Sequence, residues 1–449
     1  MTSEAKHPAI TRLFRTTFLF GLGCGISVAL TALFLDAQGF GKQDIGTLAA
    51  WFASGIVLFA LPAGALTRAL SPARVLPAAL IGYALSITVF PFTHGYGQVA
   101  AVRFLDGACS VTIWVSSETA LLARAGRSNK AHLTSLYAIY LALGYGLGPV
   151  LASVTAPVVP MHWAFVAAGA LATAAALHAR GLARRGDAGA GAGGVEAGGS
   201  ALAGRGVEAG DTLAERGGGA GEARAGRGEA EHGGAGSGAG ALAILWRIKT
   251  SCFAAFSYGY FQASVVLFLP LYLIESKGVA RERTIVLPGL FCLGMLLFSN
   301  AVGRLGDRVG HLRVMLGLAA IGGSMILGFV YLDAYPLMCA AVFVAGATLA
   351  AMSSVSLALQ GAAVDPRDLS RSNAIYNLFY AAGILGGPPA SSVLFSRYGG
   401  AAMLYHLAAL YAAFLAFGAA FWRDDPAARA ASARPAPSPA SPDAAVEGP

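Results

Sequence analysis

Long, uninterrupted apolar runs are the dominant pattern along this 449-residue chain. A helix needs about 20 mostly apolar residues to cross a hydrocarbon core about 30 Å thick. Transmembrane β-strands would instead give short segments of alternating character, which is not the pattern here. The apolar runs predict twelve transmembrane helices in two groups of six, at 14–35, 47–66, 75–91, 98–122, 133–154 and 161–178, and at 249–273, 285–302, 314–331, 334–358, 372–395 and 401–422.

The first run has one alternative interpretation, a cleaved secretory signal. Arg12 and Arg15 precede it, as basic residues precede the apolar part of a signal peptide. Eleven further runs follow, and no small-residue cleavage site does. We therefore interpret residues 14–35 as the first transmembrane helix.

Composition supports lipid as the solvent of this chain. Hydrophobic residues make up 56% and charged residues only 12%, whereas a soluble domain is about 45–50% apolar and about 25% charged. With the N-terminus in the cytoplasm, 25 of the 31 Lys and Arg residues fall in cytoplasmic segments and 5 in the opposite loops. This bias predicts that both termini are cytoplasmic, and the localisation expected is the inner cell membrane. Topology and anionic lipid account for the net charge of +8 without a nucleic-acid partner.

A Gly/Ala-rich segment separates the two groups of helices. Gly and Ala make up 37 of the 60 residues from 181 to 240. A segment of this composition cannot bury enough apolar surface to form a packed core. We predict an all-α membrane protein with an N-terminal six-helix bundle (1–180), a disordered cytoplasmic linker (181–243), a C-terminal bundle (244–425) and a disordered tail (426–449).

The two groups are repeats related by a constant offset of 239 residues. Tyr137 maps onto Tyr376, and Gly64 maps onto Gly303. A longer match joins a triplet in the fifth run to one in the eleventh, namely Gly144, Gly148 and Pro149 to Gly383, Gly387 and Pro388. Parallel six-helix repeats build one major transporter architecture, in which the substrate site lies between the repeats near the bilayer midplane.

The loop after the eighth run carries the most specific motif. It contains Gly303, Asp307, Arg308 and Gly310 in the order G-x-L-x-D-R-x-G, and in this it resembles the major facilitator superfamily. The resemblance covers the whole chain except the linker and tails. It implies the twelve-helix fold of that family, two pseudo-symmetric bundles, and a loop that acts in conformational change.

The first-half copy of this loop departs from the family pattern. It keeps Gly64 but places Arg68 where the family has a carboxylate. From the pseudo-symmetric placement of the two loops we predict a charge-swapped latch. Its pairs are Arg68 with Asp365 or Asp368, and Asp307 with Arg127 or Lys130.

The fourth run carries a polar stripe. At about 100° per residue, five side chains lie within an arc of about 120°, namely Arg103, Asp106, Ser110, Trp114 and Glu118. Ionisable residues within a span normally face a cavity or a partner. Arg103 together with Gly107 also resembles the family's R-x-x-x-G motif. This resemblance implies proton coupling. We predict a buried Arg103–Asp106 pair and proton exchange at Glu118. The alternative is a purely structural pair, with Glu118 reaching cytoplasmic water.

The fifth and eleventh runs share a G-x-x-x-G-P sequence. Its spacing places two glycines on one face and favours close helix packing, while the proline favours a bend. Gly144, Gly148 and Pro149 carry it in the first half, and Gly383, Gly387 and Pro388 in the second. The sequence is similar to the motif of the family's antiporters, which implies exchange.

Polar side chains also stack on the seventh, tenth and eleventh runs. They could orient a substrate or form interhelical hydrogen bonds, and they are Tyr258, Gln262, Ser353, Ser356, Gln360, Asn377 and Tyr380. No nucleotide-binding G-x-x-x-x-G-K-[ST] loop is present, and the five cysteines lie singly in apolar runs without metal-ligand spacing. We therefore expect no catalytic residues, cofactor or metal.

The leading functional interpretation is a monomeric secondary transporter that exports small organic compounds in exchange for protons. Proton-coupled uptake and facilitated diffusion fit the same sequence. A protein of a different class, a transporter-like sensor or scaffold, is a further alternative. A polar cavity between the halves would count against it.

Overall fold

A computed structural model describes residues 8–124, 130–182, 240–365 and 368–425. Every regular element in these ranges is helical. Twelve helical segments are long and apolar enough to cross a bilayer, which confirms the predicted number and grouping of spans.

The first half consists of six membrane-length helices, each longer than the apolar run that predicted it. They are α1 (Pro8–Ala37), α2 (Lys42–Leu70), α3 (Pro72–Val89), α4 (Tyr96–Leu122), α5 (Lys130–Thr155) and α6 (Met161–Arg180), with a short helix η2 (Phe90–Phe92) after α3. Helix α1 packs against both α5 and α6, and its Leu30 and Leu33 are buried. This packing agrees with the interpretation of α1 as the first transmembrane helix of the bundle.

The second half repeats the pattern with two local differences. A short helix precedes the eighth span, and a π-helical turn, η4, interrupts the tenth. The elements are α7 (Ala241–Lys277), α8 (Arg281–Thr284), α9 (Leu287–Val309), α10 (His311–Phe329), α11 (Tyr335–Ala345), η4 (Gly346–Ala350), α12 (Ala351–Ala363), α13 (Leu369–Tyr398), α14 (Gly400–Ala420) and the short η6 (Trp422–Asp424).

Helix α7 begins at Ala241, within the predicted linker range 181–243. Residues 181, 182 and 240 of that range are described too, while residues 183–239 and the predicted tail lie outside the described residues. The division of the chain into two bundles and a linker therefore stays a prediction at these boundaries.

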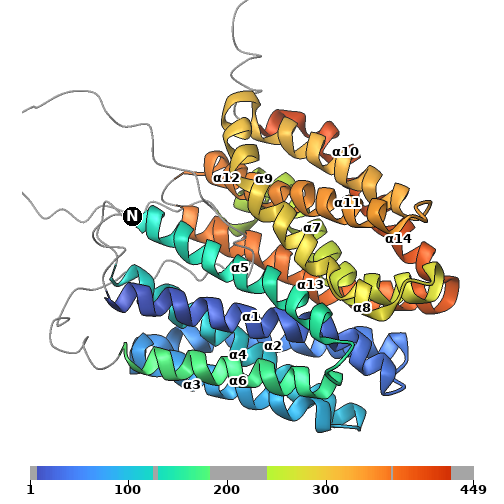
Figure 1. Ribbon diagram of the computed structural model, residues 1–449. Helices are drawn as coiled ribbons and strands as arrows, with labels where there is room; N and C mark the ends of the chain where they lie inside the picture. The colour runs from blue at the N-terminus through green and yellow to red at the C-terminus, as the bar shows by residue number, and fades with distance from the viewer. Residues whose placement is uncertain (1–7, 125–129, 183–239, 366–367, 426–449) are drawn as a thin grey trace, which may run out of the picture.

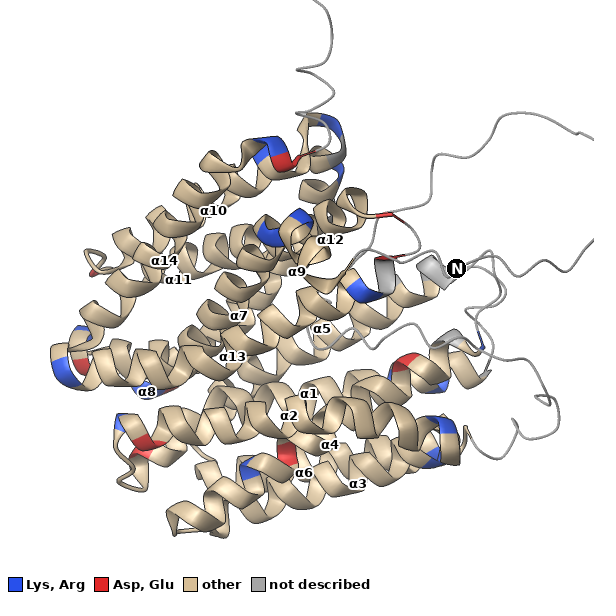
Figure 2. Cartoon of the chain, turned by 180° about the vertical axis from the view of Figure 1, so that it is seen from behind, with Lys and Arg blue, Asp and Glu red and all other residues tan. Residues whose placement is uncertain are grey.

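Two helical bundles lie side by side in Figure 1, with α1–α6 on one side and α7–α14 on the other. Across the boundary between them, α2 packs on α13, α5 on α9, and α1 on α7. We call the end of the bundle that carries Pro8, Gly181 and Gly240 the linker end, and the opposite end the far end. Figure 2 shows that Lys, Arg, Asp and Glu gather mainly toward the helix ends, while the middle of the bundle is largely free of them.

Paired glycines set the closest helix crossings, and the repeat preserves them. A Cβ on Gly107 of α4 would collide with the carbonyl oxygen of Phe52 on α2. In the second half, Gly346 meets the carbonyl oxygen of Phe291 on α9 in the same way, and each of these residues lies 239 positions after its counterpart. The crossing tolerates no side chain at either glycine.

The G-x-x-x-G-P sequences face the first helix of each half. A Cβ on Gly148 would lie 2.6 Å from the carbonyl oxygen of Leu22 on α1, and one on Gly387 would lie 2.5 Å from that of Tyr260 on α7. Pro149 and Pro388 lie inside continuous helices. Leu22 and Tyr260 are 238 residues apart, so α7 is displaced by one residue relative to the 239-residue offset of α5 and α13.

Candidate functional site

A cavity of about 310 Å³ lies between the two halves, lined by α1, α2, α4 and α5 on one side and by α7, α9 and α13 on the other. Seven aromatic side chains line it, namely Phe52, Trp114, Tyr137, Tyr145, Tyr258, Phe291 and Tyr380. Such a wall suits an apolar or aromatic ligand.

Helix α4 supplies the charged part of the first-half wall. Arg103 Nη1 donates to Asp106 Oδ2 at 2.5 Å, and both residues are buried. Ser110 Oγ lies 3.4 Å from the other carboxylate oxygen. The ring of Phe52 covers the guanidinium, with 4.4 Å between Arg103 Cζ and the ring centroid. Arg103 lines the cavity, so the predicted buried pair is present and one member faces the space between the halves.

Glu118 and Trp114 line the same cavity. Glu118 follows Arg103 by fifteen residues, which is about 22 Å along an α-helix. Because α4 runs from the far end to the linker end, Arg103 lies at the deep part of the cavity and Glu118 at the part nearer the linker end. The cavity is therefore chemically different at its two ends.

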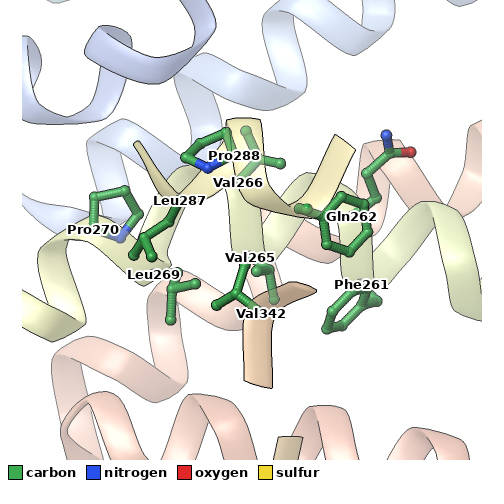
Figure 3. Close-up of a pocket in the computed structure, with 10 residues that line it drawn as sticks. Phe261, Gln262, Val265, Val266, Leu269, Pro270, Leu287, Pro288 and Val342 are labelled. Atoms are coloured by element: carbon green, nitrogen blue, oxygen red, sulfur yellow. The ribbon is translucent and has the colours of Figure 1, made fainter. Parts of the chain in front are cut away.

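Helices α7 and α13 supply the polar part of the second-half wall. Tyr380 Oη donates to Gln262 Oε1 at 2.8 Å, and the rings of Tyr258 and Tyr380 stack with their centroids 6.1 Å apart. All three residues line the cavity. Gln262 also borders a small apolar pocket of about 20 Å³ between α7, α9 and α11. In Figure 3 its amide points away from the apolar side chains of that pocket.

The other polar residues predicted for the cavity lie elsewhere among the described residues. Ser356 Oγ is 2.7 Å from Tyr376 Oη and donates to the carbonyl oxygen of Ser353. Gln360 Nε2 donates to Ser372 Oγ, and Asn377 Nδ2 to Asn373 Oδ1. These contacts are within or between α12 and α13, as the alternative of interhelical hydrogen bonding expects.

That α5 lines the cavity was not predicted from the sequence. Tyr137, Leu141, Tyr145 and Pro149 all line the cavity and follow one another at intervals of four residues. This spacing puts them on one helix face, a signal that could have identified α5 as part of the wall.

The far end of the cavity is closed by contacts between the halves. Lys42 Nζ at the start of α2 lies 2.7 Å from Glu275 Oε1 near the end of α7. Ser153 Oγ on α5 donates to the carbonyl oxygen of Glu282 on α8 at 2.6 Å. A Cβ on Gly289 of α9 would lie 2.7 Å from the carbonyl oxygen of Gly146. The backbones therefore meet directly at this end.

The predicted latch at the linker end is only partly within the described residues. Arg127 lies outside them, and the side chains of Lys130 and Asp307 are likewise not described. Arg68 is exposed, and no ion pair joins it to Asp365 or Asp368 in the described part of the chain. Because such pairs are expected only when that end is closed, the latch stays a prediction.

No group of three or more His, Cys, Asp or Glu side chains placed to hold a metal ion is found in the described ranges. The five cysteines are free thiols.

The family model of the Major Facilitator Superfamily matches residues 13–227 and 251–446. The chain belongs to the major facilitator superfamily. The two matched segments cover most of the two six-helix halves, and this confirms the family suggested by the loop motif and the repeat.

Solved structures of this superfamily share the fold at low sequence identity. The nucleoside transporter NupG superposes with a TM-score of 0.72 at 12% identity, over 92% of this chain and 99% of NupG. A bacterial homologue of the human lysosomal transporter Spinster, inward-facing and occupied, gives 0.67 at 11%, over 94% and 97%. The human organic anion transporter MFSD10 (TETRAN) gives 0.59 at 15%, over 93% and 100%. A search of curated proteins finds no match.

Proposed function

We propose that this superfamily member is a secondary active transporter that exports small organic compounds in exchange for protons. The observation that carries the proposal is the cavity between the halves, which is lined by an ionisable side chain, Glu118, and by seven aromatic rings. Binding of a compound in the cavity and binding of a proton at Glu118 would compete for the same cavity, which gives exchange without direct contact between them.

Closure at the far end supports alternating access. The ion pair of Lys42 with Glu275 and the backbone contact of Gly289 with Gly146 hold that end together, while the cavity reaches Glu118 and Thr134 toward the linker end. With both termini in the cytoplasm, this is the inward-facing state, in which an exporter takes up its substrate. We place the protein in the cytoplasmic membrane, functioning as a monomer.

Transport by the purified protein in liposomes tests the proposal. A panel of small organic compounds is offered with and without an imposed proton gradient. We expect gradient-driven accumulation of at least one compound, abolished by a protonophore. A matched control is Ala138→Phe, because Ala138 lines the cavity and a larger side chain there should obstruct it.

Each alternative predicts a different result. Transport that a protonophore leaves unchanged would make the protein a facilitator. Transport of the compound in the same direction as the protons would make the protein an importer. Absence of transport for every compound, with a folded protein, would favour the sensor or scaffold.

A further inference from the structure

The guanidinium of Arg103 has donors that the fold does not use. An arginine carries five N–H donors and no acceptor, and among the described residues only Nη1 has a hydrogen-bond partner, the carboxylate of Asp106. Nε is buried without a partner in the described part of the chain. The residue is 9% exposed, and it lines the cavity. Nε has almost no accessible surface, so a ligand acceptor would bind at the exposed edge of the guanidinium, where a donor left without an acceptor costs free energy.

The counter-charge of Arg103 is buried and does not line the cavity. Asp106 is 3% exposed and is not one of the described residues that line the cavity. Phe52 covers one face of the guanidinium, which leaves its edges for hydrogen bonding. A ligand entering the cavity therefore meets the cation first. Arginine edges match carboxylates in geometry and bind them with charge-assisted hydrogen bonds.

The rest of the wall suits an aromatic body. The Tyr258 and Tyr380 rings stack on each other, and Trp114 and Tyr145 stand on the opposite half. The volume of about 310 Å³ is at the lower end of the range of about 300–1,000 Å³ for small-ligand sites, which favours compact ligands.

We propose that the cavity binds compact aromatic carboxylates, with the carboxylate on Arg103 and the ring between the aromatic side chains. This rests on the proposed function only in that the cavity is the transport site. It adds the charge and shape of the compound and a ligand-binding role for Arg103.

The test is a binding measurement on the full chain in lipid nanodiscs by isothermal titration calorimetry at neutral pH. Three probes share one ring system and differ in charge: 2-naphthoate, 2-naphthamide and 2-naphthylmethylammonium. We expect 2-naphthoate to bind the wild-type protein about tenfold more tightly than 2-naphthamide, as a charge-assisted hydrogen bond in place of a neutral one predicts.

Two substitutions separate a ligand-binding arginine from a structural pair. Asp106→Asn leaves the cation without its counter-charge and should raise the preference for 2-naphthoate a further few-fold. The double variant Arg103→Gln/Asp106→Asn keeps a hydrogen-bonded neutral pair and should remove the preference. The matched control is Asp333→Asn, the same change at a carboxylate that is 90% exposed and paired with Lys277, which should leave all three affinities unchanged. Thermal unfolding of each variant checks that it is folded.

The opposite signs of the two effects are the decisive result. Equal losses for all probes in both Asp106 variants would mean a purely structural pair and would overturn the proposal. Tighter binding of 2-naphthylmethylammonium, or no binding of any probe to the folded wild type, would overturn it as well. Proton coupling is read in a separate assay, so a protonophore-insensitive protein that prefers 2-naphthoate would refute the exchange mechanism and leave the role of Arg103 intact.

Discussion

Ser117 on α4 and Tyr137 on α5 share a hydrogen bond, with 2.7 Å between their hydroxyl oxygens. The contact recurs 239 residues later, where Ser356 Oγ and Tyr376 Oη are also 2.7 Å apart. In each half this bond joins the fourth membrane-spanning segment to the fifth. The two tyrosines differ in two respects. Tyr137 lines the cavity and Tyr376 does not, and Tyr376 Oη also donates to the carbonyl oxygen of Ser353 at 3.1 Å.

The first of these differences predicts unequal effects of the same substitution. Tyr137→Phe and Tyr376→Phe should each lower stability by about 0.5–1 kcal/mol, the usual value of a hydrogen bond between membrane helices. Only Tyr137→Phe should also change the affinity for transported compounds. Thermal unfolding and substrate competition would measure the two effects. A loss of affinity in Tyr376→Phe equal to that in Tyr137→Phe would contradict the assignment of the cavity wall.

A second prediction concerns the loops at the linker end. Ser71 has φ 72° and is the non-glycine residue with positive φ in the described part of the chain, while Gly310, 239 residues later, has φ 106°. A side chain in this conformation costs about 1–3 kcal/mol, and Ser71 makes no capping hydrogen bond in return. Ser71→Gly should therefore stabilise the protein by about 1 kcal/mol. The mirror change, Gly310→Ser, should destabilise it, and thermal unfolding of both variants checks the two signs.

How much of this structure follows from the sequence depends on the kind of feature. The number of spans follows from bilayer thickness, and the repeat follows from glycines and prolines whose backbones approach too closely to accept a side chain, as at Gly148 and Gly387. The Arg103–Asp106 pair follows from helical spacing on a single element. Each of these is local or is repeated, so a single sequence carries it.

Features that depend on contacts between two helices could not be predicted from the sequence in the same way. The ion pair of Lys42 with Glu275 joins helices from different halves, and it depends on which end of the cavity is closed. Gln360 and Asn377 are residue types that are common in substrate sites, yet their hydrogen bonds are made to neighbouring helical residues. Residue type could not decide between these roles, because hydroxyls and amides serve both.

The Lys42–Glu275 pair should bias the conformational equilibrium. The lysine side chain is 23% exposed and that of the glutamate 39%, and Lys42 also lies 5.2 Å from the ring centroid of Phe395. A pair this exposed contributes about 0–1 kcal/mol, so Lys42→Gln should shift the equilibrium toward opening at the far end by at most about fivefold. Fold stability should change little.

Cys292 lines the cavity and can report that shift. In a variant with the other four cysteines replaced by alanine, Lys42→Gln should increase labelling of Cys292 by an impermeant maleimide added at the far side of the membrane. The double swap Lys42→Glu/Glu275→Lys should restore the original rate. If single and double variants label alike, the pair does not hold the far end closed.

The last prediction concerns the carboxylate of Glu118. It lines the cavity with Tyr137 on a helix whose other acidic side chain, Asp106, is paired with Arg103. Glu118→Gln resembles the protonated acid, so it should abolish gradient-driven export while binding of the compound persists. The matched control is Glu282→Gln, the same change at an exposed position on α8, which should leave export unchanged. The measurements are transport in liposomes over a range of pH and binding to the purified protein. Export by Glu118→Gln against a gradient with wild-type pH dependence would show that Glu118 does not couple the proton, and the exchange mechanism would then need another carrier.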